Sequence, residues 1–595
     1  MDPKAMEKRN LVAQWAFDTS PILGRFHLWL EDVEIEWLNG ERHSDFNGSV
    51  SFVDAGMERM FTMTAAVTAL GTQLFGRFGE GMNQDKKGLN QVKKDADAIS
   101  AYAMSESLWY LSRSLPENHA IMVCLGEGLM PKAGETPEMG SNPLLGFGRV
   151  YARPQVARFL EIRVQQLINS DDYTWEEFEH ELQHEGITVW GTAIDTLENT
   201  SRFAKGATTG PLTVLHVFDQ PLCITKPYEG YIGNLVLPRE VTEAAEEESL
   251  LINFFTPREK VLEAIRIACP GIKNENVHVW TLRGKGRDLR IGKIWEEWAS
   301  VGAHLVQDGW ELPNGQKAFT DSGTYAPTFL VGTWEDAEGE PHLFLVDGYA
   351  ASAEAIQAAS LYPIFDLDVS LVVFSSKYEL GHDREPLIMR LNPDAEDFGE
   401  QLSRVFEKEL DEKTIERYRS NILQARTAGI PLDKKLVRAD DFLPGKRWDV
   451  MAISGYMLPD PYTGAPGVRQ VGDDTYQVTV RLSTKRGDKR TTLRLRLVES
   501  FEESRLVFNP LLNRFLRGED YTDRRVTLSD SGRIRNELQT LCTEALEHFA
   551  DHSIKFHFDR IPADVIPPDD QVKLREILEW YMANHPIWFK WLEII

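Results

Sequence analysis

The spacing of hydrophobic and polar positions changes character about four times along the chain. Up to about residue 120 the pattern is mainly helical after a short β-like opening, because 54–78 and 95–114 repeat apolar residues at helical intervals. The apolar run at 120–126 predicts a short buried strand. The first part of the chain is therefore expected to be helical, with one strand near its end.

A long segment rich in Gly, Pro and Met follows this strand, over residues 127–153. Loops of this length are often functional or disordered, and we expect either a lid over a site or an arm that contacts another subunit. Two helices are predicted next, at 154–169 and 174–185. Pro154 favours the start of the first, because proline suits the first position of a helix.

From about residue 210 strands alternate with helices. Strands are predicted at 211–219, 250–255, 277–282, 328–334, 342–348 and 368–375, and helices from Thr256 and Pro257, at 289–307 and at 352–361. Thr256 is the expected N-cap of its helix, with Pro257 in the first turn. The strands at 328–334 and 342–348 are expected to pair as a hairpin. The alternation indicates a sheet with some parallel pairing.

The last third of the chain changes pattern again. It is predicted to be helical at 395–428, linker-like at 430–447, β-rich at 447–508 and helical at 531–552 and 570–594. The clearest strand pair flanks the tripeptide at 486–488, where alternating positions surround a glycine-containing turn.

Together these patterns predict a multi-domain α/β (mixed α+β) protein with a central mixed sheet and flanking helices. A chain of 595 residues exceeds the size of one hydrophobic core. The expected regions are a mainly helical one at 1–205, an α/β core domain at 206–430, and a hairpin followed by helices at 431–595.

Composition narrows the classes of binding partner and the cell compartment that we expect for this protein. The net charge is −27, which argues against nucleic acid or an anionic membrane as a general partner, because phosphate contacts need a basic surface. Four cysteines without paired spacing fit a reducing compartment. The N-terminus has no apolar signal-peptide region, and the uncharged stretch at 61–76 is too short to span a bilayer. The protein is therefore expected to be cytoplasmic.

One short motif points to a metal. His180, Glu181 and His184 match the H-E-x-x-H pattern, which on a helix places two imidazoles on one face to bind zinc and a glutamate to act as general base. This resembles the zincin metallopeptidase motif over five residues only. The charged neighbours Glu179 and Glu185, and Gly186, which ends the helix two residues after the motif, favour an ordinary exposed helix instead.

A basic segment stands out in this acidic chain. Its cationic side chains, between a predicted strand and a predicted helix, are Arg283, Lys285, Arg287, Arg290 and Lys293. Free N–H groups at a helix start favour an anion, and arginine donates forked hydrogen bonds to phosphate or carboxylate. The segment matches neither the P-loop nor the Rossmann fingerprint. The alternative is a solvated loop that pairs with acidic neighbours.

Polar residues also follow two other predicted strands. Asp347, Tyr349 and Ser352 lie where one strand leads into a helix, and Lys377 and His382 follow the next. Ligands of open α/β sheets gather outside the carboxyl ends of strands, so these segments are expected to converge on a cleft. Ordinary turn and capping chemistry is the alternative.

A second basic segment is the hairpin at 481–496, where seven Lys/Arg face one Asp. A basic ribbon can contact RNA, but this one lacks the interleaved aromatic residues that stack on bases. A solvated face of an antiparallel sheet is the simpler interpretation.

The leading hypothesis is a cytosolic enzyme acting on a small anionic metabolite, phosphorylated or carboxylated. The five cations of 283–293 and Ser352 would bind the anion, and the acid/base candidates are Asp347, Tyr349, Lys377 and His382. A zinc-dependent hydrolase using His180, Glu181 and His184 is one alternative, and zinc is the only cofactor considered. A non-catalytic scaffold that forms homo-oligomers is the other.

Overall fold

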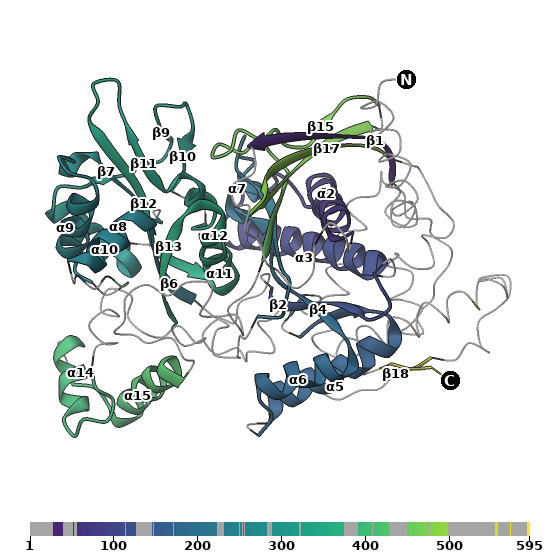
Figure 1. Cartoon of the computed structure of the whole chain (residues 1–595), viewed down its shortest axis with the longest axis horizontal. Helices are drawn as coiled ribbons and strands as arrows, with labels where there is room; N and C mark the ends of the chain where they lie inside the picture. The colour runs from purple at the N-terminus through teal and green to yellow at the C-terminus, as the bar shows by residue number, and fades with distance from the viewer. Residues whose placement is uncertain are drawn as a thin grey trace.

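The computed structural model (Figure 1) describes the chain in pieces. The described residues are 28–39, 52, 56–112, 115–126, 145–146, 148–170, 172–222, 231–248, 250, 252, 254, 256–282, 288–320, 323–373, 391–406, 409–427, 449–473, 475–497, 554–556, 572 and 592–594. They form a mixed α/β structure built on two large sheets. The predicted fold class is thereby confirmed.

The larger sheet has nine strands in the described part of the chain. Their order is β1 (Leu28–Asn39), β17 (Gly487–Leu497), β16 (Thr475–Thr484), β14 (Val450–Tyr456), β5 (Leu212–Phe218), β4 (Thr188–Glu198), β2 (His119–Gly126) and β3 (Val150–Ala152), with β15 (Arg469–Gln470) beside β16. Pairing is antiparallel except between β2 and β4. This sheet draws strands from all three of the expected regions, and the proposed domain boundaries stay a prediction.

The smaller sheet has six strands among the described residues, all of them within the predicted α/β core region. Its order is β13 (Leu367–Val373), β6 (Tyr231–Pro238), β12 (Pro341–Ala351), β7 (Val277–Trp280) and β8 (His304–Leu305), with β11 (Gly332–Glu335) beside β12. β7 runs parallel to β12 and to β8, whereas β6 is antiparallel to both β12 and β13. β7, β12 and β13 therefore all end at the same edge of the sheet.

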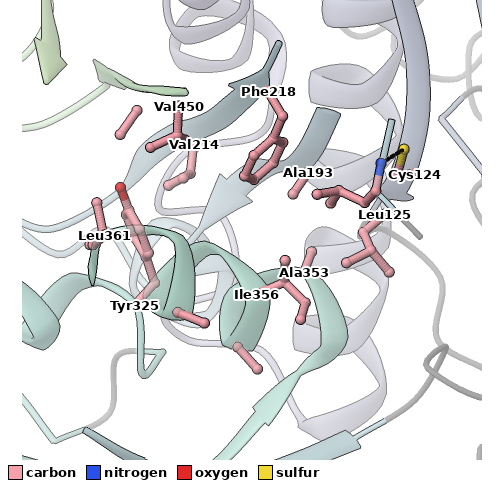
Figure 2. Close-up of a cluster of buried hydrophobic side chains, with 14 of the residues drawn as sticks. Cys124, Leu125, Ala193, Val214, Phe218, Tyr325, Ala353, Ile356, Leu361 and Val450 are labelled. Carbon is pink, nitrogen blue, oxygen red and sulfur yellow. Dashed lines mark hydrogen bonds between the residues drawn. The ribbon is translucent and has the colours of Figure 1, made fainter. Parts of the chain in front are cut away.

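Helices cover both faces of this smaller sheet. One face packs on α8 (Arg239–Glu247), α9 (Arg258–Ala268) and α10 (Asp288–Ser300) in a core that includes Leu345 and Trp298. α11 (Ser352–Ser360) and α12 (Tyr362–Phe365) lie on the other face. α11 also contacts β4 of the larger sheet, so it is the layer between the two sheets. Figure 2 shows Ala353 and Ile356 of α11 in the same buried cluster as Val214 and Phe218 of β5.

Two long helices pack on the larger sheet, α2 (Met57–Phe75) and α3 (Lys86–Leu111). α2 lies close to β14 at Gly455, where a Cβ atom would stand 2.5 Å from the carbonyl oxygen of Ala65. The missing side chain therefore sets the distance between helix and sheet. Helices α5 (Pro154–Asn169) and α6 (Trp175–Glu185) contact β2, β3 and β4.

Several predicted helices and the predicted hairpin are confirmed, together with the residues that were expected to begin or end them. Pro154 begins α5. Thr174 caps α6 through a reciprocal capping box with Glu177, and Gly186 ends that helix in the left-handed conformation at φ 65°. The basic hairpin also forms, with Thr484 opposite Gly487 at its tight end.

Other predictions were wrong in detail. Pro257 is the N-cap of α9 and has an extended backbone, so the helix begins one residue later than predicted and has no side-chain cap. The segment predicted as a strand at 328–334 starts within a 3-10 helix, Ala326–Leu330, which has Pro327 as its second residue; only the part from Gly332 onward is a strand. In the predicted strand at 250–255, the described residues 250, 252 and 254 belong to no strand.

The segment at 395–428 divides into α14 (Phe398–Phe406) and α15 (Glu412–Thr427). The end of the helix predicted at 570–594 is instead the short strand β19 (Leu592–Ile594), which pairs with β18 (Ile554–Phe556). The predicted helix at 531–552 and most of 570–594 lie outside the described residues, as does the segment 127–144. Within the part that the structure describes, every helix is too short or too polar to cross a membrane.

Candidate functional site

The ends of three parallel strands converge at one edge of the six-stranded sheet. The register pairs Trp280 of β7 with Val346 of β12, so Leu282 emerges beside Gly348. On the other side, β6 begins at this edge and pairs Asn234 with Gly348. The basic segment starts immediately after Leu282 in the sequence, and α10 begins at Asp288. The last described residue before the basic segment, Leu282, therefore lies beside Gly348 of β12, and the convergence of the basic segment with this edge stays a prediction.

Gly348 and Asn234 face each other near this edge of the sheet. A Cβ atom added to Gly348 would meet its nearest described heavy atoms, the Oγ1 of Thr281 and the N of Leu282, at the ordinary contact distances of 3.9 Å and 4.0 Å. Asn234 stands opposite Gly348, and directly opposed residues of antiparallel strands project to the same face. The Asn234 side chain therefore lies next to Gly348 on that face.

The Asn234 side chain is fully buried, yet among the described residues neither its Nδ2 nor its Oδ1 has a hydrogen-bond partner. Burying a polar group without a partner costs about 1–3 kcal/mol, and native structures rarely leave one without an explanation such as a ligand or ordered water. Thr281 adds a second polar group close to Gly348. Its Oγ1 accepts from Trp295 Nε1 at 3.2 Å, which leaves its own hydrogen available for donation.

Asp347, one of the predicted acid/base groups, lies on the opposite face of β12 and is fully buried. Its two carboxylate oxygens accept from Arg258 at 2.7 Å and 2.8 Å, and one also accepts from Trp298 Nε1 at 2.7 Å. Tyr349 is buried on the same face, and its ring meets Phe254 edge-on at 5.6 Å. These two side chains belong to the core against α9 and α10, on the face of β12 opposite to Gly348.

The remaining predicted residues of the anion site are described only in part. Arg290 and Lys293 lie in α10 and Ser352 is the first residue of α11. Arg283, Lys285, Arg287, Lys377 and His382 lie outside the described residues.

The H-E-x-x-H segment lies in α6, where Phe178 and Leu182 form the buried face. His180 and His184 are exposed, and Glu181 forms an ion pair with Arg163. In the described ranges, no cluster of three His, Cys, Asp or Glu residues is arranged to hold a metal ion. The zinc hypothesis stays a prediction without a third ligand.

Three histidines on neighbouring strands form a hydrogen-bonded chain that no sequence motif indicates. His342 Nε2 contacts Asp336 at 3.2 Å, His342 Nδ1 contacts His278 Nε2 at 2.9 Å, and His278 Nδ1 contacts His304 Nδ1 at 2.7 Å. If His342 donates to Asp336, one set of neutral tautomers satisfies every bond, with each imidazole donating to the next. Burial, together with His304 and His342, lowers the pKa of His278 to about 3. Trp310 and Trp334 pack on the His278 ring.

A second buried polar network lies between the two sheets. Ser360 donates to the carbonyl of Gln357, so His216 Nδ1 donates to Ser360 Oγ at 2.6 Å. His216 Nε2 then accepts from the hydroxyl of Tyr325 at 2.9 Å. Burial lowers the pKa of His216 to about 3, so this imidazole is neutral at pH 7.

Acidic residues surround the same region. Burial raises the pKa of Glu354 to about 7, and burial and Asp195 raise the pKa of Asp97 to about 8. Glu354 accepts backbone hydrogen bonds from Ala351 and Thr324, so it caps the start of α11. No sequence signal identified these carboxyls, because they come from α3, β4 and α11, far apart in the chain.

The second basic segment is neutralised by acidic partners. Arg490 pairs with Glu36, and Arg494 and Arg496 both pair with Glu31 of the adjacent strand β1. Within the hairpin, Arg481 pairs with the buried Asp488 at 2.7 Å. The hairpin is the inner partner of an acidic edge strand rather than an open basic ribbon.

Comparison with known proteins identifies no family for this chain. The chain matches no protein-family model, and no curated protein shows significant similarity to it.

Proposed function

We propose that this protein binds a small anionic metabolite, phosphorylated or carboxylated, at the edge of the six-stranded sheet where β7, β12 and β13 end, and acts on it as an enzyme. The observation that carries the proposal is the buried side-chain amide of Asn234, beside Gly348, which has no hydrogen-bond partner among the described residues. The chain that leaves β7 passes Gly348 at Leu282 and leads directly into the basic segment 283–293.

The chemistry of the segment supports an anion as the charged part of the ligand. Arg283, Lys285 and Arg287 lie between the end of a strand and the start of α10, where free N–H groups and the helix dipole favour negative charge. Lys377 and His382, which follow β13, are the acid/base candidates that remain nearest to this edge in the topology. Asp347 is bound on the other face by Arg258, so we assign it a structural role. A cytoplasmic location and homo-oligomer formation accompany the proposal.

The test is a thermal-shift panel of phosphorylated and carboxylated metabolites on the full-length protein. A ligand that binds only the folded state stabilises it by about 2.7 kcal/mol at 100 times its Kd. The expected result is a shift with at least one anionic metabolite that Arg287→Ala reduces. Arg404→Ala is the matched control, because Arg404 is exposed on α14, where it pairs with Glu400. The proposal fails if no anion shifts the melting temperature, or if both variants respond like the wild type.

A further inference from the structure

We infer that His342, His278 and His304 form an acid-sensitive clasp across the six-stranded sheet. While the three imidazoles are neutral, their hydrogen bonds join β12, β7 and β8 to one another and to the turn after β11. When acid protonates the imidazoles, these bonds break and the strands β8 and β11 are released. The histidines lie at the beginnings of their strands, away from Gly348, so this inference is independent of the proposed function.

The three side chains project from one face of adjacent strands. The register pairs His278 with His304, and His342 lies two residues before Phe344, the partner of His278 on β12. Trp334 of β11 stands opposite His342, and these two rings are stacked 12° from parallel. The clasp therefore crosses the sheet from β11 to β8.

The carboxylate of Asp336, in the turn after β11, fixes the direction of the hydrogen bonds. It accepts from the backbone N–H of Glu340 at 2.8 Å, and this bond is the main reason why the pKa of Asp336 lies below its usual range. An ionised carboxylate can only accept, so His342 donates to it through Nε2. His342 Nδ1 then accepts from His278 Nε2, and His278 Nδ1 accepts from His304 Nδ1.

The number of hydrogens limits how many protons the closed clasp can bind. Three neutral imidazoles carry three N–H groups, and the three contacts use all of them. The nitrogen outside these contacts is Nε2 of His304, which can bind a first proton without breaking a bond. A second proton must enter a nitrogen that already accepts a hydrogen bond, so two N–H groups would face each other. The open form, in which each imidazole meets water, therefore binds more protons than the closed form.

Burial keeps the centre of the closed clasp neutral. The side chain of His278 is only 6% exposed, because Trp310 and Trp334 pack on its ring. This burial is the largest reason why the pKa of His278 is lowered to about 3, and the neighbouring His304 and His342 add to it. On the other face of the sheet, β8 contacts α10, and Leu305 packs in the core there.

Charged groups of the neighbouring elements do not supply this effect, because most of them are acidic and would favour a charged imidazole. They lie in the turn after β11, at the start of β12, in and before η3 (Asn274–Asn276), after β8, and in β9 (Trp310–Glu311) and β10 (Lys317–Ala318), and include Asp336, Glu340, Lys273, Glu275, Asp308, Glu311 and Lys317. The two lysines each pair with a glutamate, Lys273 with Glu340 and Lys317 with Glu311. Desolvation, rather than a nearby cation, therefore opposes protonation of the closed clasp.

The experiment measures backbone hydrogen exchange of the full-length protein by mass spectrometry at pH 7, 6 and 5, with rates corrected for the intrinsic effect of pH. Below the ordinary histidine pKa of about 6.5 the open clasp gains protons that the closed clasp cannot bind, so protection should fall at least about 100-fold between pH 7 and pH 5. The loss is expected in residues 304–311 and 332–344. The hairpin at 475–497, which contains no histidine, should keep its protection. Equal losses in both regions would mean that acid unfolds the whole protein, and would contradict a local clasp.

Two variants test the assignment to the histidines. His278→Phe keeps an aromatic ring between the tryptophans but removes the centre of the clasp, so the change in protection between pH 7 and pH 5 should shrink to less than about 10-fold. His342→Gln keeps a donor for Asp336 in place of Nε2 and should lie between the wild type and His278→Phe, and it replaces His278→Phe if that variant does not fold. His184→Phe, at an exposed position of α6, should respond like the wild type.

The pH dependence separates the clasp from a merely structural role, in which a variant would lower protection by the same factor at every pH. The inference is wrong if the wild type is equally protected at pH 7 and pH 5. It is also wrong if His278→Phe or His342→Gln keeps the full pH dependence of the wild type.

Discussion

The carboxylate of Asp347 is held by more hydrogen bonds than a group that exchanges protons with a substrate would make. Arg258 donates to both of its oxygens, and Trp298 donates to one of them as well. Arg258 in turn donates to the carbonyls of Phe254 and Thr256, which fixes the turn that leads into α9. At the scale of single residues, the ion pair between Arg258 and Asp347 connects α9 to the central strand β12.

Breaking this pair should destabilise the fold. Arg258→Met leaves the Asp347 carboxylate buried without its cation, and the expected loss is about 3–5 kcal/mol in the free energy of unfolding, measured by urea denaturation. Arg258→Met combined with Asp347→Leu should recover part of that loss, because no buried charge remains. Lys260→Met, which removes the exposed pair with Glu263 on the same helix, should change stability far less. Equal losses for the two single variants would contradict a structural role for Asp347.

Single polar residues were the hardest features to predict. Asp347 was predicted at the end of a strand, but β12 continues to Ala351, and the sequence could not reveal that Arg258, 89 positions away, pairs with this carboxylate. Asn234 has no local signature, because one asparagine in an apolar strand becomes informative only when its surroundings are known. The histidine chain likewise depends on the register of β7, β8 and β12.

At the scale of elements, the sequence was most informative where a boundary has its own chemistry. Pro154 and the Thr174 capping box set the starts of α5 and α6, and these helices were predicted closely. β4 was missed because ten of its eleven positions are buried, so no alternation of polar and apolar residues marks it. β6 was missed for a related reason, since its described inner residues are buried on both faces.

The contact between α2 and β14 depends on a missing side chain. Gly455→Ala would place a Cβ atom 2.5 Å from the carbonyl oxygen of Ala65, so the helix must shift away from the sheet. The expected cost is about 1–3 kcal/mol, as for other overpacked sites, and a lower midpoint of urea denaturation would show it. Gly292→Ala, inside α10 with no atom within 4 Å, should be neutral or slightly stabilising. A Gly455→Ala variant as stable as the wild type would contradict the close approach.

The pairing of the basic hairpin with β1 also makes a testable prediction. Because Glu31 and Glu36 engage three of its arginines, the wild type should not be retained on single-stranded DNA at physiological salt. Glu31→Gln with Glu36→Gln should increase retention at low salt. Glu409→Gln with Glu412→Gln changes the net charge equally at exposed positions on or near α15 and should not. Identical elution of the two double variants would show that net charge, rather than this pairing, controls retention.

At the scale of the whole molecule, the layer between the two sheets contains titratable side chains that are buried in their neutral form. Burial lowers the pKa of His216 and raises the pKa of Glu354, both of which contact this layer. The two kinds of group respond to pH with opposite signs. A histidine whose folded pKa is lowered stabilises fully above its unfolded pKa and loses that contribution as the pH falls below about 6.5. A carboxyl whose folded pKa is raised stabilises below its unfolded pKa and loses that contribution as the pH rises.

The α/β class followed from the alternation of strands and helices, and the convergence of three strand ends followed from the parallel order. The residues that meet in the layer between the two sheets could not be predicted from these patterns, because they come from both sheets. Asp97 of α3, Asp195 of β4 and Glu354 of α11 have no common motif, and only the tertiary structure brings their carboxyls together. Sequence patterns predict which face of an element is buried, but not which buried polar groups will meet.

Asp97 provides the clearest test of this layer. Its pKa is raised to about 8, so the folded protein keeps it protonated at a pH where the unfolded chain ionises it, and its contribution to stability is lost between about pH 4 and pH 8. Asp97→Asn is neutral at every pH. Its stability relative to the wild type should therefore increase through this window, by at most about 1.4 kcal/mol per pH unit, in urea denaturation at pH 5, 6, 7 and 8. Asp473→Asn, at an exposed position, should follow the wild type. A constant difference between Asp97→Asn and the wild type would mean that Asp97 is ionised in the folded protein.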